Sequence, residues 1–346
     1  MTTRKNLAVW RSALGLVLAA IAVAVIGRTP VLEAQGRSDL ENRHQRLLPL
    51  FETPGVVFTD GDETRDRLVV GVLNRGVAAQ VRARLRALGV DETVDIVETE
   101  PIIALATLRD RAPSTISGGL QIRFSQYLCS LGFPAVRGDV QGFVTASHCS
   151  DQQGTVDSTE YYQPLNQIDD DFIGTEIADP VYVKGGKCPR GRRCRRSDAN
   201  FSRSGGPRAV VLGKIAHTTE LGSLEIDLNN PFTITADGVD QYEPKVGDTA
   251  NKVGRTTGWT RGTITNTCVD TGVQGATIVL LCQNFVNGNG VIVQGGDSGS
   301  PVFATGGPSN GVILLGGLWG GNQSGTQFVY SPIGNIKDDL GALTTH

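Results

Sequence analysis

The feature that most constrains this fold is a long series of short, apolar β-type segments in residues 118–346. Segments such as "GFVTA", "FTITA", "TIVLLCQNF" and "GVILLGGLWG" are rich in β-branched and aromatic residues, and Gly, Asn or Asp separates them. Short strands at this spacing predict an all-β sandwich or barrel. The 44 glycines among 346 residues agree with many tight turns, since about 7% glycine is typical. At the end of the chain, Ile336 and Leu340 lie four positions apart after Pro332, which predicts a short C-terminal helix.

Residues 66–108 have a different pattern. "DRLVVGVL" and "TVDIVETEPIIAL" have strand composition, and "VAAQVRARLRAL" between them places its apolar residues on one helical face. This order predicts a small β-α-β unit. Residues 35–65 are polar, and the stretch "TDGDETRD" is expected to form a loop. Because so small a unit buries little core alone, we expect it to pack on the neighbouring domain. We place the domain boundary between residues 35–114 and 115–346.

The N-terminus has the pattern of an export signal. Arg4 and Lys5 precede an apolar run from Ala13 to Ile26, which is too short to span a membrane comfortably. We predict a signal peptide over residues 1–34 and a secreted or periplasmic protein with no membrane span after cleavage. A retained N-terminal anchor is the alternative. The net charge of −3 argues against a general nucleic-acid binder, and we expect a monomer.

Six cysteines in an exported chain indicate disulfide bonds. Six cysteines allow 15 pairings, and proximity in sequence favours three short loops. A zinc site is the competing interpretation, but no C-x-x-C or paired histidine spacing supports it. The predicted pairs are Cys129–Cys149, Cys188–Cys194 and Cys268–Cys282.

The stretch "GGDSGSPVF", residues 295–303, places Ser298 between glycines just before an apolar segment. A glycine-rich turn explains it, and so does a nucleophile whose small neighbours leave room for a substrate carbonyl. A nucleophilic serine needs an adjacent base, usually histidine. The sequence offers His148 in "GFVTASHCS", directly after an apolar segment and beside a cysteine. The remaining histidines are His44, His217 and His346.

The order of these residues separates two classes of hydrolase. An α/β-hydrolase has the order Ser, Asp, His and a G-x-S-x-G elbow, whereas Ser300 stands here in place of the last glycine. A histidine well before the serine fits the two-barrel serine proteases instead.

"TASHC" and "GDSGSP" resemble the histidine and serine motifs of the chymotrypsin-like serine peptidases. The bacterial secreted branch, with the streptogrisins and α-lytic-type proteases, is the most similar in pattern. The resemblance covers residues 115–346. It implies two six-stranded antiparallel β-barrels with the site between them, and hydrolysis of protein or peptide substrates through an acyl-enzyme. It implies no metal or cofactor.

The family's third catalytic residue is an acid between the histidine and the serine. Asp198 in "CRRSDANFSR" fits this position, and its expected role is to orient the ring of His148 and to stay ionised. The rivals are Asp169, Asp170 and Asp171, although three consecutive acids more often form a solvated turn.

The resemblance also implies an oxyanion hole formed by the backbone N–H groups of Gly296 and Ser298. Asp297 then anchors the loop, and "VGRTTGWTRGTI" resembles the bacterial branch, in which an internal arginine pairs with that aspartate. We therefore expect an ion pair between Asp297 and Arg255; an exposed arginine in a hairpin is the alternative.

The resemblance further implies that substrate adds as a β-strand to "GLWGG", with Trp319 and Gly320 lining the primary pocket. A core or turn role is the alternative for each of these two residues. Ile292 and Val293 should form the pocket floor, and Phe328 is expected to make the pocket shallow. None of these residues is acidic, so we expect a small or medium apolar side chain before the scissile bond.

Seven basic residues lie between Lys184 and Arg196. A solvated, disulfide-closed loop is the favoured interpretation, and a patch that attracts acidic substrates or holds an anionic surface is the alternative. Two other functions remain open for the chain: an inactive, protease-like binding protein, or an esterase on the same barrel. Residues 35–114 are expected to be a propeptide or a retained accessory module.

Overall fold

The structure is a computed structural model that describes residues 39–90, 94–102, 105–239 and 242–346. The predicted signal peptide, residues 1–34, lies outside these ranges. The chain divides into two compact units, Met1–Ala104 and Leu105–His346, which we call the N-terminal and C-terminal units.

The division falls ten residues before the predicted boundary at 114/115. Residues 105–114 belong to the C-terminal unit because their backbone bonds to it. The N–H of Leu108 donates to the carbonyl of Leu224 over 2.9 Å, and that of Gln121 donates to the carbonyl of Leu108 over 2.8 Å. These bonds add the segment to the edge of the C-terminal fold.

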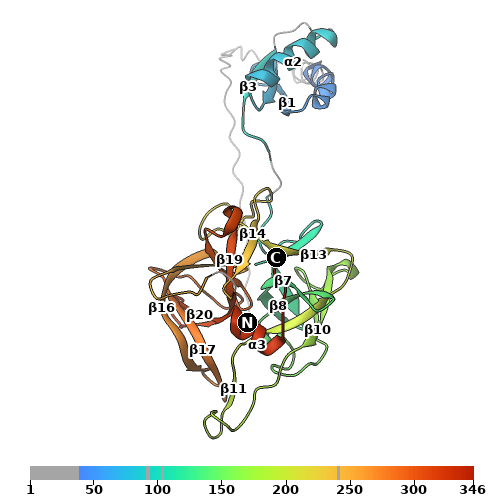
Figure 1. Ribbon diagram of the computed structural model, residues 1–346. Helices are drawn as coiled ribbons and strands as arrows, with labels where there is room; N and C mark the ends of the chain where they lie inside the picture. Colours follow the sequence, from blue (N-terminus) through green and yellow to red (C-terminus); the bar gives the residue numbers. More distant parts are fainter. Residues whose placement is uncertain (1–38, 91–93, 103–104, 240–241) are drawn as a thin grey trace, which may run out of the picture. The chain divides into compact units, whose positions relative to one another are not determined.

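The N-terminal unit contains the predicted β-α-β arrangement. Strands β2 (Arg67–Val72) and β3 (Val94–Glu98) pair in parallel, and helix α2 (Arg75–Ala87) connects them (Figure 1). Asn74 caps the helix by accepting a hydrogen bond from the N–H of Val77, which satisfies one of its free N–H groups. The buried face of α2 carries Val77, Ala78, Val81 and Leu85.

The predicted loop "TDGDETRD", residues 59–66, is correct only in its second half: residues 59–62 belong to a strand and residues 63–66 form a turn. Residues 39–45 are helical, η1 (Leu48–Glu52) is a 3-10 helix, and β1 (Val56–Asp62) pairs antiparallel with β2. Leu40, Leu47 and Leu50 are buried with α2 and β2 in one core. A few leucines thus anchor this segment in the core. Its polar overall composition gave no sign of this burial. The prediction that the N-terminal unit packs on its neighbour stays a prediction.

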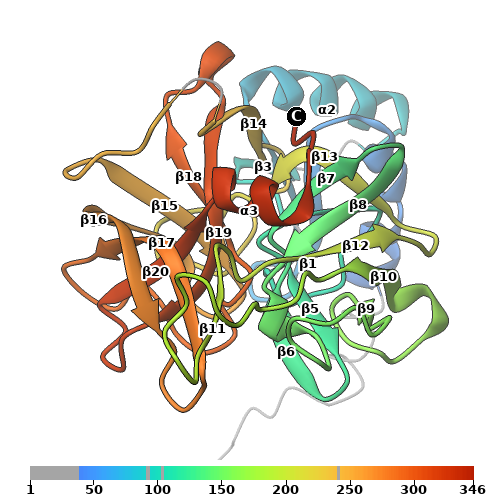
Figure 2. The ribbon, with the colours of Figure 1, turned by 60° about the horizontal axis from the view of Figure 1, so that its bottom comes forward.

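The larger sheet of the C-terminal unit has ten strands, and six of them close into a ring. The closed path runs β15, β16, β17, β20, β19, β18 and back to β15, with every neighbouring pair antiparallel (Figure 2). In a closed ring every strand has a partner on both sides along part of its length. The strands of this sheet are β4 (Thr115–Gly118), β11 (Arg193–Arg195), β13 (Ala209–Ile215), β14 (Phe232–Asp237), β15 (Thr249–Gly254), β16 (Gly258–Gly272), β17 (Ile278–Asn287), β18 (Pro301–Thr305), β19 (Val312–Gly321) and β20 (Gln327–Pro332).

The other sheet has seven strands in the order β6-β5-β9-β10-β12-β8-β7. The predicted all-β class with a C-terminal helix is confirmed, the helix being α3 (Ile333–Leu340). The predicted count of six strands per barrel holds for the closed ring, whereas this sheet pairs as an open path of seven. Its strands are β5 (Gln121–Phe124), β6 (Tyr127–Ser130), β7 (Phe133–Arg137), β8 (Val140–Thr145), β9 (Glu160–Tyr162), β10 (Phe172–Ala178) and β12 (Asn200–Ser204).

One hydrophobic core joins the two sheets and α3. Phe143 and Phe201 from the seven-stranded sheet belong to the same buried cluster as Phe303 of β18 and Ile336 of α3. A second cluster, with Phe328 and Tyr330, fills the closed ring. Because cores are packed as tightly as organic crystals, the shared cluster fixes the two sheets against each other.

Candidate active site

His148 lies in a single 3-10 turn, η2 (Ser147–Cys149), that begins just after β8 ends. The disulfide Cys129–Cys149 ties the end of this turn to β6. The neighbours of His148, Ser147 and Cys149, are fully buried, while its own side chain is 33% exposed. The turn therefore holds an accessible imidazole on a rigid support.

Asp198 binds this histidine twice. Its Oδ2 lies 2.6 Å from Nδ1 of His148, and its Oδ1 accepts the backbone N–H of His148 over 3.0 Å. The Asp198 side chain is only 2% exposed. Since a buried carboxylate accepts hydrogen bonds, Nδ1 carries a proton and Nε2 of the neutral ring is free to act as a base.

The pKa values of the pair shift in opposite directions. Burial alone would lower the pKa of His148, but the adjacent Asp198 carboxylate outweighs it and raises the pKa above 6.5. Burial would likewise raise the pKa of Asp198, but the charge and hydrogen bonds of His148 lower it. The aspartate thus stays ionised while the imidazole becomes a stronger base.

Three further side chains, which the sequence did not single out, hold Asp198. Ser331 accepts its backbone N–H over 3.0 Å, and Gln153 and Tyr182 donate to its Oδ1 over 3.3 and 3.4 Å. They come from segments far apart in the sequence, so no local motif could have indicated them.

The rival acids lie elsewhere. Asp169–Asp171 forms the short turn η3 before β10. Asp171 is buried and accepts from Nε of Arg111 over 2.9 Å, and it also caps the backbone of Gln167. Its carboxylate therefore stabilises the start of a strand, and the structure brings Asp198 to His148 instead.

Ser298 lies in the glycine-rich loop that precedes β18. Its hydroxyl forms no hydrogen bond to any described residue, and neither do the backbone N–H groups of Ser298 and Gly296. Gly296 has φ +94°, a conformation that glycine adopts readily. A Cβ on Gly299 would lie 2.2 Å from the carbonyl oxygen of Ser130, so only glycine fits there. The loop therefore presents a free hydroxyl beside two free donors.

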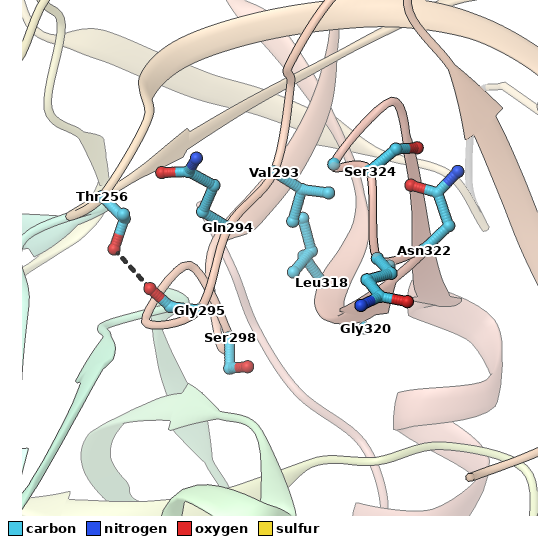
Figure 3. Close-up of a pocket in the computed structure, with 12 residues that line it drawn as sticks. Thr256, Val293, Gln294, Gly295, Ser298, Leu318, Gly320, Asn322 and Ser324 are labelled. Atoms are coloured by element: carbon cyan, nitrogen blue, oxygen red, sulfur yellow. Dashed lines mark hydrogen bonds between the residues drawn. The ribbon is translucent and has the colours of Figure 1, made fainter.

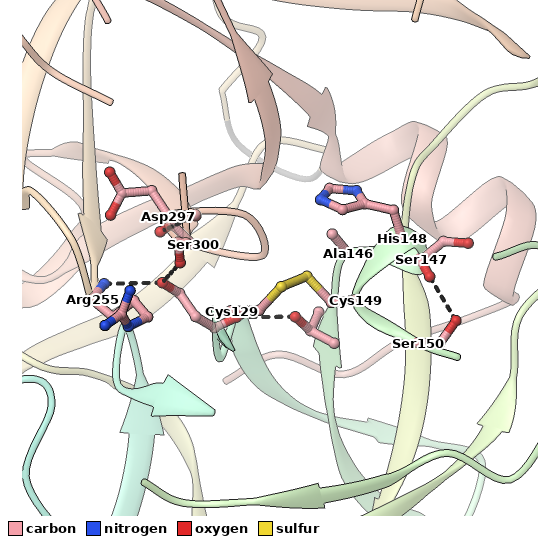
Figure 4. The surroundings of a disulfide bond; sticks show 12 residues. Cys129, Ala146, Ser147, His148, Cys149, Ser150, Arg255, Asp297 and Ser300 are labelled. Atoms are coloured by element: carbon pink, nitrogen blue, oxygen red, sulfur yellow. Dashed lines mark hydrogen bonds between the residues drawn. A yellow bond between two sulfur atoms is a disulfide. The ribbon is translucent and has the colours of Figure 1, made fainter. Parts of the chain in front are cut away.

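A short chain of bonds connects this loop to the histidine turn. The carbonyl of Ser298 accepts the N–H of Ser130 over 2.8 Å, and Ser130 adjoins Cys129 of the disulfide to Cys149. Figure 4 shows this disulfide between the loop that carries Asp297 and the turn that carries His148. No hydrogen bond joins Ser298 to His148 among the described residues. Catalytic hydrogen bonds of this type are often long before substrate binds.

Asp297 anchors the loop, but its cation is Lys252 rather than Arg255. Oδ2 of Asp297 lies 3.5 Å from Nζ of Lys252, and both side chains are 0% exposed. The backbone N–H groups of Thr256 and Thr257 donate to Oδ1 over 2.9 and 3.1 Å. A fully buried ion pair thus holds the loop in place.

The predicted ion pair with Arg255 is therefore wrong. Nε of Arg255 donates to Gln121 over 2.7 Å, and its guanidinium packs against Gly296, where a Cβ would lie 2.6 Å from it. Lys252 lies within β15, whereas Arg255 lies in the turn that follows this strand, so the two side chains leave the backbone in different surroundings. Burial lowers the pKa of Lys252 to about 8, against the opposing effect of Asp297.

Bacterial proteases of known structure are similar to this chain. Thermobifida fusca protease A is 22% identical, with a TM-score of 0.46, and Nocardiopsis protease is 20% identical, with a TM-score of 0.47. A homolog of alpha-lytic protease is 17% identical, with a TM-score of 0.47. Each match covers 67% of this chain and 100% of the other. The chain is thus similar in structure to bacterial proteases, the group that its motifs "TASHC" and "GDSGSP" resemble. No protein-family model and no curated protein matches the sequence.

A cavity of about 630 Å³ opens beside Ser298 (Figure 3). No charged side chain lines it. Val293 and Gly320 lie in its wall as predicted, whereas Ile292 is buried in the core of the closed ring. The lining residues are Thr256, Val293, Gln294, Gly295, Ser298, Leu318, Gly320, Gly321, Asn322, Gln323, Ser324 and Gly325.

Two other predicted pocket residues lie outside this cavity. Phe328 is fully buried in the core of the closed ring and does not make the cavity shallow. Trp319 packs beside Tyr182 and Leu280, and its indole N–H donates to Gln283 over 2.9 Å. The turn 322–325, which the sequence did not indicate, supplies part of the cavity wall instead.

The disulfides of the structure are the three predicted pairs. Besides Cys129–Cys149, they are Cys188–Cys194 and Cys268–Cys282. Among the described residues, no helix is both long and apolar enough to cross a membrane.

Proposed function

We propose that the C-terminal unit is a serine endopeptidase, with Ser298 as nucleophile, His148 as general base and Asp198 as the residue that orients it. The observation that carries this proposal is the loop at 295–299. It combines an unbonded serine hydroxyl with two unbonded N–H groups, and a disulfide connects its support to an imidazole already oriented by a buried aspartate.

In the first half of the reaction, Oγ of Ser298 attacks the peptide carbonyl while Nε2 of His148 takes its proton. Breakdown of the tetrahedral intermediate passes that proton to the leaving amine and leaves an acyl group on Ser298. Water then attacks the ester, again with His148 as base, and releases the acid. Asp198 stays ionised and stabilises the imidazolium at each step.

The N–H groups of Gly296 and Ser298 would bind the oxyanion that develops on the carbonyl. Removal of one such donor typically costs about 2.7–4 kcal/mol of transition-state stabilisation. Their direction depends on the loop, and the loop depends on Asp297 and Lys252. We therefore assign Lys252 as a positioning residue for the oxyanion hole.

The substrate would bind as an added strand along β19. Pairing between β18 and β19 stops at Pro301 and Gly317, so the edge beyond Leu318 has no partner strand on that side. A peptide there places one side chain in the uncharged cavity beside Ser298. We infer an uncharged side chain of small or medium size before the scissile bond.

Export and processing are part of the same proposal. Three disulfides and no free cysteine among the described residues favour an oxidising compartment. We propose that the N-terminal unit is a propeptide or an accessory module. The mass of the protein recovered from the medium distinguishes them: a mature chain that begins near residue 105 indicates a propeptide.

The test is hydrolysis of amide bonds. The purified protein should cut an unfolded protein substrate at uncharged residues, with fragments identified by mass spectrometry. Ser298→Ala should abolish cutting, whereas Ser324→Ala, in the wall of the same cavity, should retain most of it. Hydrolysis of esters without any cleavage of amides would overturn the endopeptidase in favour of an esterase, and reactivity towards neither would favour a binding protein.

A further inference from the structure

The seven basic residues between Lys184 and Arg196, which we call the basic loop, have little compensating charge. Arg195 is buried and pairs with Asp179 over 2.7 Å, and Arg196 lies 3.3 Å from Asp338. The other five are exposed, and among the described residues no carboxylate lies within 4.0 Å of them. They are Lys184, Lys187, Arg190, Arg192 and Arg193. Such a cluster creates a local positive potential that attracts anionic groups.

The basic loop is held in a defined position. The disulfide Cys188–Cys194 closes it, and Val183 and Cys194 exchange two backbone hydrogen bonds of 3.0 and 2.8 Å. Strand β11, at its end, pairs in parallel with β17 (Figures 1 and 2). The charges are therefore presented from a fixed base, which lowers the entropy cost of binding a partner.

Both ends of the basic loop are attached to the candidate active site. At its start, Tyr182 donates to Asp198 and packs in one apolar cluster with Trp319. At its end, the carbonyl of Arg196 accepts from Gln283 over 2.7 Å, and Gln283 in turn accepts the indole N–H of Trp319 over 2.9 Å. The basic loop thus adjoins β19 on the side of Trp319.

We propose that the basic loop is a substrate subsite that binds aspartate or glutamate in the second to fourth positions before the scissile bond. This rests on the proposed function, with the substrate strand on β19. Side chains of a strand alternate between two faces. If one residue enters the uncharged cavity, the next residue towards the substrate's N-terminus points away from it, towards Trp319 and the basic loop. Long lysine and arginine side chains then reach the neighbouring positions.

The experiment uses two peptides with the same residue before the scissile bond. One carries Glu in the second to fourth positions, and the other carries Gln there. The protein should cleave the Glu peptide with a kcat/KM about tenfold higher at 50 mM NaCl. At 1 M NaCl the ratio should fall towards one, because the screening length drops to about 3 Å.

The variant K184Q/K187Q/R190Q removes three cations whose side chains form no hydrogen bond or ion pair with any described residue, and it should reduce the ratio to about one. The control K245Q/R203Q/R261Q removes three exposed cations elsewhere in the same unit and should keep the tenfold preference. Reaction of Ser298 with a fluorophosphonate confirms that each variant is folded.

Equal cleavage of the two peptides by the unmodified protein would overturn the subsite and leave the endopeptidase intact. If the protein cleaves neither peptide and does not react with the fluorophosphonate, both proposals are overturned. If the peptide ratio is one but the loop variant releases the protein from vesicles that contain phosphatidylserine, the basic loop binds an anionic surface and the subsite is wrong.

Discussion

Each sheet of the C-terminal unit buries an aspartate beside the candidate active site, but the two carboxylates have different partners. Asp198, two residues before strand β12 of the seven-stranded sheet, pairs with His148, whose side chain is 33% exposed. Asp297, before the closed ring's strand β18, pairs with Lys252, and both side chains are 0% exposed. In the proposed mechanism His148 exchanges protons with the substrate, which agrees with its partial exposure. Lys252 only has to stay charged, and it is fully buried.

The hydrogen bonds of the two aspartates fit this difference. At Asp198 one backbone N–H donates, from His148, and the other donors are the side chains of His148, Gln153 and Tyr182. At Asp297 three backbone N–H groups donate, from Thr256, Thr257 and Gln294, together with the hydroxyl of Thr257. Backbone donors fix the path of the chain, whereas side-chain donors orient a group. Asp297 thus determines where the loop lies, and Asp198 determines how a ring is turned.

The largest effect is expected for Asp198→Asn. The amide cannot accept the Nδ1 proton as a carboxylate does, so His148 takes the wrong tautomer, and kcat should fall about 10⁴-fold. The measurement is kcat on an amide substrate. Asp169→Asn, an exposed acid of η3, is the control and should change kcat less than twofold. A loss below tenfold in Asp198→Asn would contradict the assignment.

Lys252→Met should lower kcat about 10²–10³-fold, comparable with the loss of one oxyanion donor. The substitution leaves the carboxylate of Asp297 buried without its cation, so the loop no longer holds both N–H groups in place. Lys252→Arg should restore much of the activity, which a merely space-filling role would not explain. Lys245→Met, at an exposed position, is the control for loss of a lysine.

The two partners also predict a bell-shaped pH profile. Activity should rise with pH as His148 loses its proton, with a pKa above 6.5, because only the neutral ring is a base. Activity should fall again as Lys252 loses its proton near pH 8 and leaves Asp297 uncompensated. In Lys252→Arg the alkaline limb should move upward while the acid limb stays. If this substitution leaves the alkaline limb unchanged, the protonation of Lys252 does not control activity.

Glu176 offers a third case, a buried acid on β10 that forms no ion pair with a cation of the described residues. Burial, the main cause, raises its pKa to about 8. The folded state then keeps a proton that the unfolded chain releases near its ordinary value of 4.5, so stability falls as pH rises from about 4.5 to 8. Glu176→Gln should remove this decline and raise the melting temperature at pH 8 by about 3–8 °C. Thermal unfolding against pH measures it, and the exposed Glu220→Gln should follow the unmodified protein.

The smallest effect is expected for Arg255→Ala, since Arg255 bonds to Gln121 rather than to Asp297. The value of kcat/KM should fall by no more than about threefold, close to the result for Arg261→Ala, an exposed arginine of β16. A hundredfold loss would mean that Arg255, and not Lys252, holds the loop.

The sequence was sufficient for features that depend on local order. Alternating strands and turns predicted the all-β class, and short loops between cysteines predicted all three disulfides. The resemblance of "TASHC" and "GDSGSP" to protease motifs indicated an acid between His148 and Ser298, and the structure brings Asp198 to the histidine. The same resemblance implied Gly296 as an oxyanion donor, which stays a prediction; its φ of +94° favours glycine at this position.

Features that depend on burial could not be predicted. Lys252 stands in "TANKVG", and its charge suggests a solvent-facing position on a strand. Five of the six residues of β15 are buried, because the closed ring covers one face and the shared core covers the other. Likewise, the link from Trp319 through Gln283 to Arg196 joins β19, β17 and the residue just after β11, which are distant in sequence. Only the folded arrangement shows that the basic loop adjoins the site.

The most direct measurement is the intact mass of the protein after reaction with a fluorophosphonate, followed by mapping of the modified peptide. One adduct per chain on Ser298 is predicted, forming faster as pH rises through the pKa of His148, and absent from His148→Ala on the same timescale. An unmodified Ser298, or a reaction rate that is the same with and without His148, would contradict the account.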